Sequence, residues 1–276
     1  MLSIRTNVAS ITAQNNLSTT QTSLTNTMNQ LSSGMRITNA ADDAAGLGIS
    51  TNLEAQISSY AQAGRNANDG LSLVQTAEGS LTQVSNILTR MRDLAMESAS
   101  DGIGSTQRGY IVTETNQLQD ELDRINSTTE YNGNNFFSSG AKLSFQVGIR
   151  GTANDSISVD TTSMSVSSAN LKVDSGTIDL SSDTGAAAAI SKIDAAIDSV
   201  SGFAAQLGAA ANRFQSVSNT IQSASQNLSA ADSRIRDVDV ASATSELSRT
   251  QVLSQAGIAV LAQANQQPQM ALKLLG

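Results

Sequence analysis

Large apolar residues recur at helical spacing along most of this chain, beginning at its N-terminal end. Apart from one step, they follow one another there at intervals of three, four or seven residues, as on one face of a helix. They are Ile4, Val8, Ile11, Leu17, Leu24, Met28, Leu31 and Met35. Ser, Thr, Asn and Gln fill the positions between them. The pattern predicts an N-terminal helix with an apolar stripe and an uncharged polar face.

A second helix is predicted from about residue 44 to residue 98. Its second half carries apolar residues in strict steps of three and four, which is typical of a coiled coil. These residues are Val74, Ala77, Leu81, Val84, Leu88, Met91 and Ala95. Asn68-Asp69-Gly70 interrupts the helical region just before them. It either marks a turn or contains a glycine that the helix tolerates at a cost of about 1 kcal/mol.

The spacing of apolar residues changes in the middle of the chain. A third helix is predicted after a short connection at 101–105. Its apolar face consists of Ile111, Leu118, Leu122 and Ile125. Asn132-Gly133-Asn134 then ends the helical region. Apolar residues then alternate with polar ones, first in 143–149 and again in 157–159, which predicts a β-hairpin near 141–160. Residues 161–184 are rich in Ser, Thr and Asp, and we expect a short irregular surface loop there.

The longest regular pattern covers residues 186–228. Steps of three and four never slip along its seam, which is Ile190, Ile193, Ile197, Val200, Ala204, Leu207, Ala211, Phe214, Ser218, Ile221, Ser225 and Leu228. Such a helix spans roughly 60 Å and needs an equally long partner, for which the seam ending at Ala95 is the candidate. A final helix follows from Val240. The predicted fold is mainly α, a long helical coiled-coil bundle in which the N- and C-terminal halves fold back on each other, with one small β-hairpin.

Composition argues against an enzyme. The chain has no His and no Cys, so the commonest general base, metal ligand and thiolate nucleophile are absent. Asp42 and Asp43 form the best acidic pair, but no further ligand is near, and charge at a helix N-terminus is the simpler interpretation. We expect no catalytic, cofactor or metal site. A net charge of −8 disfavours nucleic acid as a partner, and the lack of an 18-residue apolar run argues against membrane insertion.

Charge placement sets the two ends apart from the middle. No charged residue lies between Thr6 and Met35, or between Thr250 and Leu272. An uncharged helix can be buried against copies of itself without desolvating ions, yet alone it buries little. We therefore predict that the ends pair into an assembly core, and the regular spacing argues against the alternative of two disordered tails. The core residues are Ile4, Val8, Ile11, Leu17, Leu24, Leu31, Leu253, Val260, Leu261, Leu272 and Leu275.

Several motifs resemble those of one protein family. In the N-terminal half they are Leu31-Ser32-Ser33-Gly34-Met35-Arg36-Ile37, Asp42-Asp43-Ala44-Ala45-Gly46-Leu47, Arg65-Asn66-Ala67-Asn68-Asp69-Gly70 and Arg90-Met91-Arg92-Asp93-Leu94-Ala95. In the C-terminal half they are Ser233-Arg234-Ile235-Arg236-Asp237, Gln255-Ala256-Gly257 and the run from Val260 to Gln266. These motifs, in this order, resemble bacterial flagellins over about residues 1–160 and 185–276.

The resemblance implies a filament subunit outside the cell, in the bacterial flagellum. Residues 1–42 and 237–276 would form the inner domain, and 43–236 the outer helical bundle, with the helix unbroken at Gly70. The turn with Gly34, Arg36, Asp42 and Asp43 would contact neighbouring subunits. Implied partners are other copies, an export chaperone, the type III export apparatus, and hook-associated and cap proteins. The export route would fit a first segment without a signal-peptide core.

The resemblance also implies recognition by the vertebrate innate receptor Toll-like receptor 5. Arg90, Leu94 and Glu114 stand at the corresponding positions. Two other structural roles remain open: a hook–filament junction protein, which shares these termini, and a coiled-coil adhesin that does not polymerise. An enzyme on the same frame is excluded by the lack of His and of a long insert.

Overall fold

The computed structural model describes residues 6–138, 140 and 142–275, with side chains described as far as residue 266. The chain forms two compact units, 1–57 with 226–276 and 58–225, which we call the terminal unit and the central unit. The helices are α1 (Val8–Ser33), α2 (Ala44–Ser98), α3 (Ser105–Thr128), α4 (Asp183–Arg236) and α5 (Val240–Leu275). No helix in this described part is both long and apolar enough to cross a bilayer.

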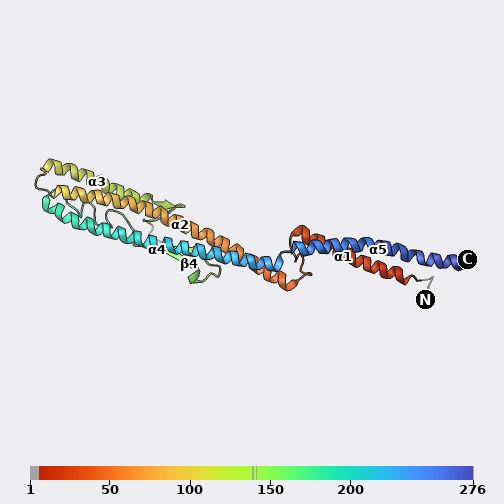
Figure 1. The fold of residues 1–276 in the computed structure, drawn as a ribbon. Helices are drawn as coiled ribbons and strands as arrows, with labels where there is room; N and C mark the ends of the chain where they lie inside the picture. The colour runs from red at the N-terminus through yellow and green to blue at the C-terminus, as the bar shows by residue number, and fades with distance from the viewer. Residues whose placement is uncertain (1–5, 139, 141, 276) are drawn as a thin grey trace. The chain divides into compact units, whose positions relative to one another are not determined.

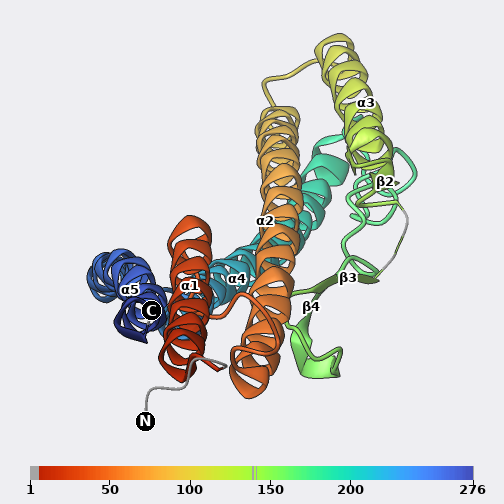
Figure 2. The ribbon, with the colours of Figure 1, turned by 90° about the vertical axis from the view of Figure 1, so that its right-hand side faces the viewer.

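In the central unit α2 packs against α4 in the antiparallel sense (Figures 1 and 2). Arg92 of α2 pairs with Asp194 of α4, whereas Gly70, earlier in α2, faces Phe214, later in α4. Every residue of the predicted α2 seam is 0–2% exposed. The prediction of two long helices that fold back on each other is therefore confirmed.

Helix α2 continues through Gly70 without a break. A Cβ atom at this position would lie 2.5 Å from the ring of Phe214, so the glycine makes room for an aromatic side chain on the partner helix. Phe214 also packs edge-to-face against Phe145, with ring centroids 5.5 Å apart. The glycine at the motif that resembled a turn is thus a packing contact between helices.

The predicted seam of α4 is right on one side and wrong on the other. Ile193, Val200, Leu207, Phe214 and Ile221 are buried as expected. The other four buried positions are alanines, namely Ala186, Ala189, Ala196 and Ala210. The last three stand one residue before the predicted Ile190, Ile197 and Ala211. Small side chains face the partner most closely because they let two backbones approach, and the isoleucines pack beside them, half-buried.

Two antiparallel strand pairs complete the central unit. Strands β3 (Lys142–Gln146) and β4 (Ser156–Asp160) form the predicted hairpin. Strands β1 (Glu130–Tyr131) and β2 (Asn134–Asn135) form a second, smaller pair that was not predicted. Asn132 and Gly133 join them with φ of 52° and 76°, the pair of left-handed residues that a type I′ turn requires.

Residues 161–184 are mostly irregular, but the prediction of a surface loop was wrong for the third of them that is buried. Alternating apolar residues are 0–6% exposed and join the core, namely Met164, Val166, Leu171, Val173, Ile178 and Leu180. Buried side chains of the helices bind this backbone: Ser98 donates to the Leu180 carbonyl at 2.7 Å, and Gln119 to the Val173 carbonyl at 2.7 Å. The segment therefore covers the core beside α3 (Figure 2).

Candidate assembly surface

In the terminal unit, α1 and α5 lie side by side and run in opposite directions (Figure 1). At the start of α1, the Asn7 amide donates to the Ala264 carbonyl at 2.8 Å, and the Ser10 hydroxyl donates to Asn265 Oδ1 at 2.8 Å. Further along α1, Gln21 contacts Ser254, which comes earlier in α5. The two ends of the chain therefore pair with each other, and their polar contacts involve uncharged side chains.

The contact face of this pair has coiled-coil spacing, but small residues fill many of its positions. In α1 the steps alternate strictly between three and four through Ser10, Ala13, Leu17, Thr20, Leu24, Thr27 and Leu31, all buried or half-buried. In α5 the corresponding positions are Ala243, Leu247, Thr250, Ser254, Gly257, Leu261 and Ala264. A Cβ atom on Gly257 would lie 3.2 Å from Leu17 Cδ1. We call these two rows the terminal seam.

The terminal seam separates the predicted core residues into two groups. Leu17, Leu24, Leu31 and Leu261 belong to it and are half-buried. The others with described side chains lie outside it and are exposed: Val8 by 65%, Ile11 by 49%, Leu253 by 48% and Val260 by 58%. Ile4 lies outside the described residues, as do the side chains of Leu272 and Leu275. The large apolar residues marked the helices correctly, whereas the steps of three and four among Ser, Ala and Thr would have marked the seam.

The threonine hydroxyl groups of α1 are already hydrogen-bonded within the helix. Thr12 and Thr20 each donate to the carbonyl four residues earlier, at 2.9 and 2.8 Å. Thr19, Thr22, Thr25 and Thr27 do the same. A donor that is satisfied in this way can be covered by another protein surface without losing a hydrogen bond. The polar face of α1 is thus suited to burial as well as to water.

A short clip joins the chain after α1 to the chain before α5. Gly34 ends α1 with φ of 72°, in the left-handed region that glycine favours at this position. Val238 N–H donates to the Gly34 carbonyl at 3.0 Å, and Arg36 N–H donates to the Arg236 carbonyl at 2.6 Å. The Arg36 guanidinium adds a bond to the Ile235 carbonyl at 2.6 Å. The predicted turn residues Gly34 and Arg36 therefore hold the two chain segments together.

The two acidic residues of the predicted turn have structural roles. Asp42 Oδ2 accepts the N–H groups of Thr38 and Asn39, each at 2.9 Å, together with the Thr38 hydroxyl. The Asn39 backbone bond, followed by those from Thr38, lowers the pKa of Asp42. Asp43 Oδ1 accepts the Gly46 N–H at 2.8 Å and so caps the start of α2. No group of three or more potential metal ligands occurs among the described residues.

The three candidate receptor residues lie together, but only two of them reach the surface. Arg90 of α2 pairs with Glu114 of α3 at 2.7 Å, with side chains that are 52% and 43% exposed. Leu94, one turn after Arg90, is 2% exposed and belongs to the core of the central unit.

Comparisons with known proteins place both halves of the chain. Residues 4–142 match the bacterial flagellin N-terminal helical region, and residues 190–275 match the bacterial flagellin C-terminal helical region. A flagellin from Halalkalibacterium halodurans is 39% identical over 248 residues, which are 90% of each chain. The crystal structure of Bacillus cereus flagellin is similar with a TM-score of 0.50 and 30% identity, over 61% of this chain and 94% of that one.

Other relatives are longer and match over part of their length. Polar flagellin F of Vibrio parahaemolyticus is 45% identical over 148 residues, which are 53% of this chain and 39% of that protein. The match thus spans well under half of that relative, whereas the Halalkalibacterium protein is matched almost throughout. With both terminal regions matched in their order, the chain belongs to the bacterial flagellin family, whose members are structural subunits of the flagellar filament.

Proposed function

We propose that this chain polymerises with copies of itself into a flagellar filament, through the surface that α1 and α5 leave exposed. The distribution of exposed large apolar residues supports this proposal most directly. Among the described residues, nine of the eleven lie in the terminal unit, and Met96 and Tyr110 are the two exceptions. The nine are Val8, Ile11, Met28, Ile49, Val240, Val252, Leu253, Ile258 and Val260.

The energetics favour burial of this surface. Covering the exposed half of each apolar side chain contributes about 1 kcal/mol, so nine of them are comparable with the roughly 4–15 kcal/mol that association costs in lost freedom. Few charges oppose burial, because α1 carries none, and its threonine hydroxyls are hydrogen-bonded within the helix. Helices of this kind pack well against copies of the same chain, whereas a charged surface would have to be desolvated first.

The domain arrangement follows from the same proposal. Residues 1–42 and 237–276 form the inner part of the filament. Residues 43–236 form the outer part, with the hairpin near 141–160 and the segment 161–184. Gly34, Arg36, Asp42 and Asp43 contact neighbouring copies, and the exposure of Gly34, Arg36 and Asp42 supports this assignment.

Further partners come from family membership. The expected ones are an export chaperone that covers the C-terminal segment, the type III export apparatus, and the hook-associated and cap proteins. The exposed apolar residues of α5 support a need for such a chaperone before assembly. For Toll-like receptor 5, the exposed Arg90–Glu114 pair supports a contact made by these two side chains, with the buried Leu94 beneath them.

The proposal is tested by seeded polymerisation of the purified full chain. We expect growth from filament fragments, and loss of growth when residues 1–36 or 250–276 are removed, with the central unit still folded by circular dichroism. Val260→Ser should raise the critical concentration, whereas Tyr110→Ser, at a still more exposed site of the central unit, should leave it unchanged. A truncated chain that still elongates filaments would refute the proposal. A full chain that adds one layer and stops would indicate a junction protein instead.

A further inference from the structure

A single ion pair stands in the otherwise uncharged part of α5. Between Asp239 and Lys273 the only charged residues are Glu246 and Arg249. They bind each other through two hydrogen bonds, Arg249 Nη2 to Glu246 Oε1 at 2.8 Å and Arg249 Nε to Glu246 Oε2 at 3.0 Å. This contact lowers the pKa of Glu246, so the carboxylate stays ionised. Both carboxylate oxygens and one edge of the guanidinium are used within a single helical turn.

The pair lies in line with apolar residues that stay about half exposed in the terminal unit. Arg249, Leu253 and Val260 follow one another at steps of four and seven, which places them along one side of the helix. Leu253 and Val260 are 48% and 58% exposed, and the side chains of Glu246 and Arg249 are 39% and 68% exposed. A surface that covers these apolar side chains must therefore also cover the ion pair.

The ion pair affects the free energy of assembly when this side of α5 is buried. The free energy of desolvation is large for a lone carboxylate or guanidinium. It is much smaller for a hydrogen-bonded pair, and smaller still for two neutral side chains. In the free chain the pair is exposed and spaced i,i+3, so it contributes little to stability. Its effect is expected where water is excluded.

We propose that Glu246 and Arg249 enter the interface between copies of this chain as a closed pair, which allows this side of α5 to be buried. This inference rests on the proposed polymerisation, and it specifies how the charged side of α5 is accommodated in the interface. The partner surface is a second copy with uncharged polar residues. Two of the five guanidinium N–H donors serve the pair, and Asn, Gln, Ser and carbonyl oxygens of the copy can accept from the other three.

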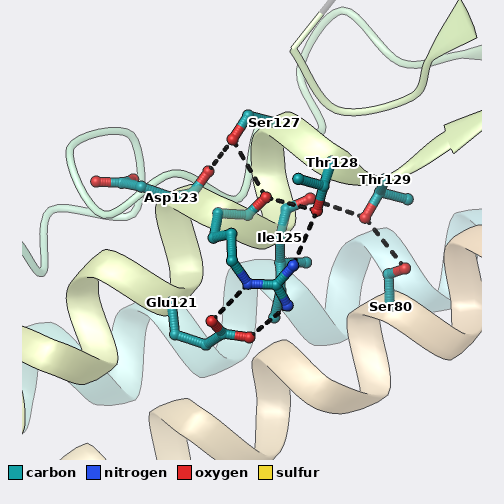
Figure 3. A network of polar contacts seen from close by, with 8 residues as sticks. Ser80, Glu121, Asp123, Ile125, Ser127, Thr128 and Thr129 are labelled. Carbon is teal, nitrogen blue, oxygen red and sulfur yellow. Dashed lines mark hydrogen bonds and ion pairs between the residues drawn. The ribbon is translucent and has the colours of Figure 1, made fainter.

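The central unit contains a matched pair that serves as a control. Glu121 and Arg124 of α3 have the same residue types, order and spacing, with two hydrogen bonds of 2.6 and 2.7 Å and exposures of 40% and 60%. Figure 3 shows Glu121 on α3 with its two hydrogen bonds. Among the described residues, α3 has one exposed large apolar residue, Tyr110, three turns before Glu121, and none within one turn of the pair. It should therefore stay in water when copies assemble.

The experiment measures the critical concentration for seeded growth of the full chain and six variants. Glu246→Gln and Arg249→Gln should each raise it by at least about tenfold, because each leaves one unpaired charge to bury. The double variant should return to within about threefold of the original chain, because no charge remains. Glu121→Gln, Arg124→Gln and their double variant should all match the original chain. Thermal unfolding of each monomer checks that the fold is retained.

The outcomes separate this inference from the proposed function. If the original chain does not grow from seeds, polymerisation itself is refuted, and the inference with it. If it grows and the two single variants grow as well as it does, or the double variant is as poor as the singles, the closed pair is refuted and polymerisation stands. An equal mixture of the two single variants should remain defective. Growth of that mixture would show pairing between copies and would overturn the closed pair.

Discussion

The seam between α2 and α4 and the seam between α1 and α5 follow the same spacing but differ in what fills them. Val, Leu and Met occupy most of the α2 seam, and all of its residues are nearly inaccessible. In the α1 row, Leu17, Leu24 and Leu31 alternate with Ala or Thr, and the leucines are half-buried. Spacing thus decides that two helices pair, whereas side-chain size decides how much of each helix the pair can bury.

The difference assigns different roles to the two units. The central unit has a continuous apolar core made by three helices, a hairpin and the segment 161–184. In the terminal unit, the seam between α1 and α5 is narrow, and nine large apolar residues of the unit are exposed. We infer that the central unit is stable by itself, and that the terminal helices depend on neighbouring copies for much of their stability.

The largest expected effect comes from replacing one leucine in each seam. Leu88→Ala should lower the free energy of unfolding by about 2–5 kcal/mol, because Leu88 is fully enclosed and leaves a cavity. Leu24→Ala should lower it by about 1 kcal/mol or less in the free chain, since water already reaches this side chain. Urea unfolding followed by circular dichroism measures both. Equal losses at the two sites would show that the seams do not differ in burial.

A second test concerns the glycine that faces Phe214 in the central seam. Gly70→Ala should destabilise the central unit by about 1 kcal/mol, because the clash with the ring exceeds the gain in helix propensity. Gly79→Ala in the same helix meets no atom within 4 Å and should stabilise the protein by up to about 1 kcal/mol. Thermal unfolding distinguishes the two directions. A stabilising Gly70→Ala would contradict the close contact with Phe214.

The smallest expected effect is a loss of stability in acid. This loss should be greater in the central unit than in the terminal unit. Hydrogen bonds from Thr152, Thr162, Thr177 and Ser181 lower the pKa values of Asp155, Asp160, Asp174 and Asp179 respectively. In the terminal unit, Asp42 has a pKa lowered by bonds of the same kind. A depressed folded-state pKa stabilises the fold above the unfolded value, near 3.9, and this stabilisation is lost as pH falls through the folded value.

The measurement is the urea midpoint at pH 6 and at pH 3. The midpoint should fall on acidification, and Asp174→Asn should reduce the size of that fall, since its side chain no longer titrates. Asp101→Asn, in the exposed connection after α2, serves as the control and should leave the fall unchanged. A fall that is identical in all three proteins would contradict a role for the Asp174 contacts.

Sequence patterns predicted the long helices and the larger hairpin because their apolar residues repeat regularly over many positions. The pair of β1 and β2 was missed because two residues per strand are too few to show alternation. The buried side of 161–184 was missed because its apolar residues stand singly among Ser, Thr and Asp, which suggested a surface loop.

The candidate site was predicted in part for a similar reason. Large apolar residues identified α1 and α5, and the scarcity of charge indicated that they would be buried. The buried positions of the terminal seam are Ser10, Ala13, Thr27, Ala243, Thr250 and Ala264. Residues of these types are common on exposed helix faces as well. Only their spacing distinguishes them, and hydrophobicity alone does not reveal it. The exposed positions of Val8 and Val260 could be assigned once the seam was known.

The clip formed by Gly34, Arg36, Arg236 and Val238 has a consequence for the order of events. Pairing two distant chain ends ordinarily requires closing a loop, and for roughly 200 intervening residues the length-dependent part costs about 5 kcal/mol. Once the clip has formed, α1 and α5 start side by side, and each is present to the other at a high effective concentration. Their pairing then resembles a zipper that opens and closes from its free end. The two helices can then separate one turn at a time, from their free ends, as another copy binds. The clip meanwhile keeps α1 and α5 in register.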